Sequence, residues 1–117
     1  MNSAGDVFVT GSTKGSMDGN SNSGYRDIVL IKFSSSGAWQ WTRQRGTGGG
    51  DRGYGVAVNS EGDIFVAGDT KGSMDGNPNS GSYDIALIKF SSTGDWQWTK
   101  QHGTSSSDRD FEIRPVS

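Results

Sequence analysis

Two stretches of the chain carry oxygen-bearing side chains at a spacing that suits a bound calcium ion. Calcium takes six to eight oxygen ligands, and in a calcium loop alternate residues point inward while a later carboxylate closes the site. Positions 1, 3, 5 and 10 of each stretch fit this pattern: Asp18, Asn20, Asn22 and Asp27, and again Asp75, Asn77, Asn79 and Asp84. We therefore predict two metal sites with these ligands, and Ca2+ as the one candidate cofactor.

The same residues have a second interpretation. Asp, Asn and Gly also close turns through local hydrogen bonds that involve no metal. The spacing also departs from that of an EF-hand, which has Gly at position 6 and Glu at position 12. Both interpretations are open at this point.

Residues suited to catalysis are scarce. His102 is the only histidine, so one chain offers neither a Ser-His-Asp triad nor a histidine-based metal site. The glycine-rich run 46–55 lacks the Gly-Lys-Ser/Thr ending of a phosphate-binding loop, and no helical pattern follows it. Asp51 and Arg52 are adjacent, and we expect them to form a local, structural ion pair. We predict that the protein is not an enzyme.

The tryptophans come in pairs two residues apart, Trp39 with Trp41 and Trp96 with Trp98. Residues at this spacing on a strand share a face of the sheet. We expect them to pack between sheets, because large aromatic side chains dominate cores and interfaces. The alternative is a platform for carbohydrate, to which Tyr25, Tyr54 and Tyr83 would contribute.

The composition excludes several classes of partner. The chain has 117 residues, a formal charge of −2 and no cysteine. Without a basic patch, nucleic acid is not an expected partner. No apolar run is long enough to span a bilayer, and the N-terminus does not have the pattern of a signal peptide. Abundant Gly, Ser, Asn, Asp and Thr suit a secreted bacterial protein, so we expect an extracellular or cell-surface location for the parent protein.

The elements that carry these residues occur twice. The two copies align without a gap at an offset of 57 residues, so that Asn2-Ser3 reappears as Asn59-Ser60. Most of the aligned positions are identical. A period above 40 residues is typical of propeller repeats. We divide the chain into a first repeat, 1–58, and a second repeat, 59–117. The first repeat predicts four strands with turn residues between them: Asp6–Ser12, Asp27–Phe33, Trp39–Gln44 and Gly53–Val58.

The second of these strands indicates how the sheets are buried. Ile28, Leu30 and Lys32 point to one face, while Val29, Ile31 and Phe33 point to the other. Both faces are largely apolar, which a sheet with one wet face would not require. This predicts an all-β protein of four-stranded antiparallel blades stacked as in a β-propeller.

The repeat resembles the bacterial SBBP repeat, which is named for a seven-bladed β-propeller. The resemblance rests on three segments: 18–24 (DGNSNSG), 27–33 (DIVLIKF) with the following Ser-Ser-Gly-x-Trp-Gln-Trp hairpin, and 53–68. It implies a propeller fold and frequent occurrence in large extracellular proteins. It implies no activity, because the family is defined by its architecture.

A propeller ring usually has four to eight blades, and this chain encodes two. The last strand of the fourth type, Asp110–Val116, could complete the three-stranded sheet of another copy. We therefore predict strand-swapped closure into a cyclic homo-oligomer of three or four chains. The predicted function is a non-catalytic structural or binding scaffold whose partners are copies of itself. The alternatives are a lectin-like, carbohydrate-binding propeller and a fragment of a larger extracellular propeller protein.

Overall fold

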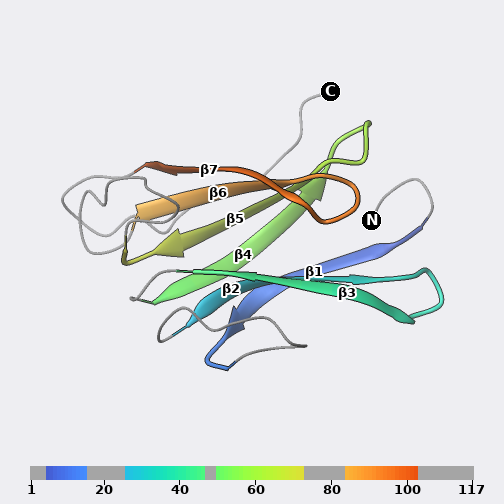
Figure 1. The fold of residues 1–117 in the computed structure, drawn as a ribbon, viewed down its shortest axis with the longest axis horizontal. Helices are drawn as coiled ribbons and strands as arrows, with labels where there is room; N and C mark the ends of the chain where they lie inside the picture. The colour runs from blue at the N-terminus through green and yellow to red at the C-terminus, as the bar shows by residue number, and fades with distance from the viewer. Residues whose placement is uncertain (1–4, 16–25, 47–49, 73–83, 103–117) are drawn as a thin grey trace.

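Seven strands in two antiparallel sheets make up the described part of the chain (Figure 1). The computed structural model describes residues 5–15, 26–46, 50–72 and 84–102. Sheet I has the strand order β1-β2-β3 and sheet II has the order β4-β5-β6-β7. Their bounds are β1 Val7–Thr13, β2 Asp27–Phe33, β3 Trp39–Arg45, β4 Asp51–Val58, β5 Ile64–Thr70, β6 Asp84–Phe90 and β7 Trp96–His102. These residues include no helix able to cross a membrane.

The predicted all-β class and the four strands of the first repeat are confirmed. β2 has the predicted bounds, and the other three strands differ by one or two residues at their ends. β4 begins at Asp51, two residues earlier than predicted, because Asp51 and Arg52 already pair with Thr70 and Asp69 of β5. The expected strand Asp110–Val116 lies outside the described residues.

Glycine closes the hairpin turn in both sheets. Gly37 and Gly94 each have a φ of 89°, a left-handed conformation that a residue with a Cβ adopts only with strain. The amide of each donates to the carbonyl oxygen of the serine three residues earlier, Ser34 or Ser91, at 2.9 Å. The two turns therefore have the same geometry.

The two faces of each sheet are defined by the strand register. In sheet I the front face carries Phe8, Thr10, Ile28, Leu30, Trp41, Arg43 and Arg45. The back face of sheet I carries Val7, Val9, Val29, Ile31 and Phe33. In sheet II the equivalent front face carries Phe65, Ile85, Leu87, Trp98, Lys100 and His102, and the back face carries Val56, Val58, Ile64, Val66, Ala86, Ile88, Phe90 and Trp96.

The core forms where the front face of sheet I packs on the back face of sheet II (Figure 1). Phe8, Ile28 and Leu30 contribute from sheet I, and Ile64, Val66 and Ile88 contribute from sheet II. β4 lies against β1 and β2. Gly53 permits this approach, because a Cβ at that position would lie 2.3 Å from Thr10 Oγ1. The sheets therefore stack front to back, as successive blades do.

Candidate functional site

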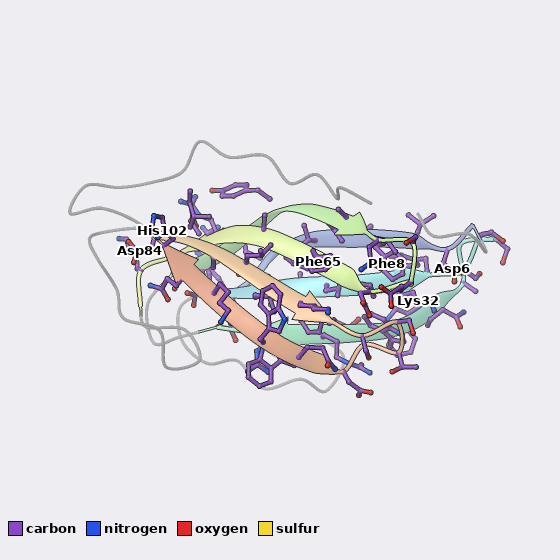
Figure 2. The ribbon with its side chains drawn as sticks, turned by 90° about the horizontal axis from the view of Figure 1, so that it is seen from above. Asp6, Phe8, Lys32, Phe65, Asp84 and His102 are labelled. Carbon is purple, nitrogen blue, oxygen red and sulfur yellow. The ribbon has the colours of Figure 1, made fainter. Side chains whose placement is uncertain are left out.

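Asp27 and Asp84, two of the predicted calcium ligands, are the first residues of β2 and β6. Both are fully buried. The Gln44 side chain donates to Asp27 Oδ2 at 3.1 Å, and the Gln101 side chain donates to Asp84 Oδ2 at 3.0 Å. Burying a carboxylate is costly unless hydrogen bonds compensate for lost water, so these glutamines stabilise the same strand start in both repeats. Figure 2 shows Asp84 at the same end of the sheets as His102.

The side-chain amides of Gln44 and Gln101 also donate to the backbone just after the preceding strand. Gln44 Nε2 donates to the carbonyl oxygen of Gly15, and Gln101 Nε2 donates to that of Gly72, each at 2.8 Å. Each glutamine therefore ties the residues that follow β1 or β5 to the start of the next strand. The other six predicted ligands, Asp18, Asn20, Asn22, Asp75, Asn77 and Asn79, lie outside the described residues, so the metal sites stay a prediction.

Two further buried carboxylates belong to the same end of the molecule. Asp51, at the start of β4, is fully buried and accepts a hydrogen bond from the Thr70 hydroxyl. Asp69, on β5, is fully buried and lies 3.6 Å from Arg52 Nε. We expected Arg52 to pair with its neighbour in sequence, whereas the strand register places it opposite Asp69. The reason is geometric, because consecutive residues on a strand point to opposite faces.

Asp27 and Asp51 bring carboxylates of different sheets together. A Cβ placed on Gly46 would stand 2.1 Å from Asp27 Oδ1 and 2.9 Å from Asp51 Oδ2. The two sheets also meet here through the backbone, because Arg26 and Gly50 form a parallel bridge. Within the described ranges, no group of three or more His, Cys, Asp or Glu side chains is placed to hold a metal ion. This part of the chain therefore supplies a buried pair of carboxylates.

The sequence contained a signal for Asp51 but none for Asp69. Asp51 has a counterpart in the second repeat, Asp108, just as Asp27 has Asp84. Asp69 replaces Ser12 of the first repeat, so comparing the repeats gives no reason to select it. Its partner Arg52 lies on another strand and becomes evident only from the register.

The prediction that the tryptophans of each pair share a face is wrong. A register shift at Lys32/Phe33 places Trp41 opposite Lys32 on the front face and Trp39 opposite Phe33 on the back face. The same shift occurs at Lys89/Phe90 in sheet II. A β-bulge adds one residue to a strand, which reverses the alternation of side chains beyond it. The indole Nε1 of Trp39 accordingly donates to Thr42 Oγ1 at 2.9 Å.

Equivalent side chains of the two sheets differ in exposure. On the back face, Val7 and Val9 are 38% and 44% exposed, whereas their equivalents Ile64 and Val66 are fully buried. On the front face the order is reversed, because Leu30 is 1% exposed and its equivalent Leu87 is only partly buried. Among the described residues, the back face of sheet I is therefore open at Val7 and Val9, while Val29 on the same face is 4% exposed, and the front face of sheet II is only partly covered at Leu87.

Short antiparallel sheets that stack front to back through apolar faces are typical of the blades of β-propellers. The comparison with known families agrees. Residues 40–73 match the model of the SBBP family, a β-propeller repeat. The matched segment runs from β3 of sheet I through the β4–β5 hairpin of sheet II. No curated protein matches the chain.

Proposed function

We propose that the chain is a non-catalytic scaffold whose blades stack front to back, and that copies of it stack in the same way into a closed ring. The observation that carries this proposal is the difference in exposure between Val9, at 44%, and the fully buried Val66. Both occupy the same position on the back face, and only Val66 is covered by a neighbouring sheet. Burying apolar surface is the main favourable term in association, so the two open faces favour stacking.

The strand order of sheet I supports the same proposal. In sheet II, β5 pairs with β4 on one side and β6 on the other, whereas β1, the equivalent of β5, is an edge of the described sheet. A strand of the β4 type from another copy would complete sheet I. Six or eight blades, from three or four chains, fall within the usual size of a propeller. If the chain is a segment of a longer extracellular propeller, neighbouring blades of the same polypeptide would cover these faces.

The mass in solution tests the ring. Light scattering over a concentration series should give three or four times the 12.4 kDa of one chain. Val9→Glu places a charge on the open back face and should reduce the mass to that of one chain. Ser60→Glu, in an exposed turn, is the matched control and should leave the mass unchanged. A single-chain mass for the unaltered protein at every concentration would refute the ring and favour the longer propeller.

Calcium binding is a second proposed function, and the buried pair of Asp27 and Asp51 supports it. Two nearby carboxylates repel each other, and a cation between them and the preceding loop would offset that repulsion. Thermal melting with calcium and with a chelator tests the proposal. A ligand at 100 times its Kd should stabilise the native state by about 2.7 kcal/mol. Equal melting temperatures at millimolar calcium and in chelator would contradict it.

Carbohydrate binding is the alternative function. Trp39 and Tyr54 are 54% and 52% exposed, and such aromatic faces can stack on a sugar ring. A glycan array tests this alternative, with Trp39→Ala and Tyr54→Ala as the variants. An array without binding, or binding that neither substitution weakens, would remove its support.

A further inference from the structure

The contact between the two sheets is anchored by an arginine at its outer edge. Arg43, on β3 of sheet I, reaches the hairpin turn of sheet II. Its Nε donates to the carbonyl oxygen of Gly94 at 2.8 Å, and its Nη2 donates to that of Thr93 at 3.4 Å. Its guanidinium also lies over Trp41, with Cζ 4.7 Å from the ring centroid. Arg43 thus joins the front face of sheet I to the turn between β6 and β7.

A second arginine continues this contact. Arg45 Cζ lies 4.2 Å from the ring centroid of Trp96, which belongs to sheet II. Together with Arg43, Asp95 and Phe90 it lines a groove of about 280 Å³ between the sheets. We call these contacts of Arg43 and Arg45 with the β6–β7 turn and Trp96 the inner seam. Arginine suits them because its planar group both stacks on aromatic rings and donates several hydrogen bonds.

Sheet I has the same hydrogen-bond acceptors in its own hairpin turn, and none of the described strands covers them. Its turn at Ser34–Ala38 has the same glycine φ of 89° and the same backbone hydrogen bonds as the turn at Ser91–Asp95. A Cβ on Gly94 would lie 3.1 Å from Arg43 Nε, whereas a Cβ on Gly37 would have nothing within 4 Å. Trp39 is 54% exposed, against 42% for its equivalent Trp96, over which Arg45 lies. The turn and the ring are therefore preformed but uncovered.

Sheet II presents the matching donors. Lys100 and His102 occupy the positions of Arg43 and Arg45 on the front face, and both are exposed. Lys100 Nζ lies 5.9 Å from the ring centroid of Trp98, as Arg43 lies over Trp41. His102 is at the end of β7 (Figure 2). Lys100 and His102 are thus placed on sheet II as Arg43 and Arg45 are placed on sheet I.

The charges change together across the equivalent positions. The inner seam combines two arginines with Asp95, whereas the other pair of surfaces combines Lys100 and His102 with Ala38, the equivalent of Asp95. Both sets carry one net positive charge when histidine is counted as neutral. The turn that would face Lys100 and His102 has Ala38 where the turn facing Arg43 and Arg45 has Asp95. The loss of one positive charge is thus matched by the loss of one negative charge, as expected if the two surfaces meet.

We infer that Lys100 and His102 dock on the Ser34–Ala38 turn and Trp39 of a second copy of the chain, forming an outer seam equivalent to the inner one. This inference rests on the proposed stacking of copies and adds which residues join them. Lys100 donates to the carbonyl oxygens of the turn, and His102 lies against Trp39. The outer seam is the weaker of the two, because lysine lacks the planar fork of arginine and histidine supplies less cationic surface.

The experiment measures the dissociation constant of the assembly by sedimentation for four proteins. Lys100→Arg with His102→Arg gives the outer seam the residues of the inner one and should tighten assembly at least tenfold. Trp39→Ala should weaken assembly at least tenfold, because it removes the ring that His102 of the other copy contacts, and aromatic side chains carry much of the binding energy of interfaces. Arg43→Lys with Arg45→His is the matched control. It should lower the urea midpoint of the single chain without tightening assembly.

The outcomes separate the inference from the function on which it rests. Assembly of the unaltered protein with a dissociation constant that neither Trp39→Ala nor the double arginine variant changes would overturn the outer seam and leave the stacking of copies intact. Failure of the unaltered protein and of the double arginine variant to assemble at any concentration would overturn both. Tightening by the double variant together with weakening by Trp39→Ala would support both.

Discussion

Leu30→Ala and Leu87→Ala make the same chemical change at equivalent positions, and the structure predicts unequal costs. Leu30 is 1% exposed in the core between the sheets. Truncation removes about three carbon atoms at about 0.8 kcal/mol for each buried CH2, or roughly 2.4 kcal/mol of transfer free energy. The enclosed cavity adds to this, so we expect a total of about 3–5 kcal/mol in the free energy of unfolding.

Leu87 lies on the open front face of sheet II and is only partly buried. Water reaches the space left by truncation there, so no enclosed cavity forms, and about half of the transfer term is lost. We therefore expect about 1 kcal/mol for Leu87→Ala in the single chain. The difference between the two variants, about 2–4 kcal/mol, measures the coverage of one front face by the next sheet.

Urea unfolding at low protein concentration measures both costs. The midpoint should fall much further for Leu30→Ala than for Leu87→Ala, with similar m values, because the surface exposed on unfolding changes little. At high concentration Leu87→Ala should become more costly, since stacking of copies would then bury that side chain. Equal losses at low concentration, within about 0.5 kcal/mol, would refute front-to-back stacking of the two sheets.

Three further predictions follow from single contacts, and two of them use the equivalent position of the other repeat as a matched control. Gly68→Ala places a Cβ 2.1 Å from a carbonyl oxygen of β4 and should cost about 1–3 kcal/mol by urea unfolding, whereas Gly11→Ala, with nothing within 4 Å, should stay within about 0.5 kcal/mol. Thr70→Val removes a donor to a buried carboxylate and should lower stability by about 1.5–3 kcal/mol. Thr13→Val should change the melting temperature far less, because the Thr13 hydroxyl accepts an exposed hydrogen bond from the Gly15 amide. Gln101→Leu deprives the buried carboxylate of Asp84 of an amide donor and should cost about 1–3 kcal/mol by thermal melting.

The strands could be predicted from the sequence because their signals are local and occur twice. The alternation in β2 indicated two buried faces, and Gly37 marked the hairpin turn. The faces of Trp39 and Trp41 could not be predicted, because the bulge depends on pairing with β2. A repeated sequence gave no warning, since the second copy contains the same bulge.

The candidate site was predicted less completely than the fold. Asp27 and Asp84 were selected by spacing, and the structure adds the glutamine that holds each one. The approach of Asp27 to Asp51 depends on how two sheets meet, which spacing within one loop does not specify. The pairing of Arg52 with Asp69 depends likewise on strand register.

The direction of stacking follows from the difference between the two faces of a blade. A front face with charged side chains at its outer edge packs on a back face whose turn accepts hydrogen bonds. Two open front faces would instead bring Lys100 and His102 of one copy against the same residues of another. Such head-to-tail contacts are heterologous, and they close into a ring only when the rotation between successive units divides a full turn. That rotation is already set within one chain by the close approach of β4 to β1 at Gly53. If copies stack as the two sheets do, this packing sets how many copies a closed ring would contain.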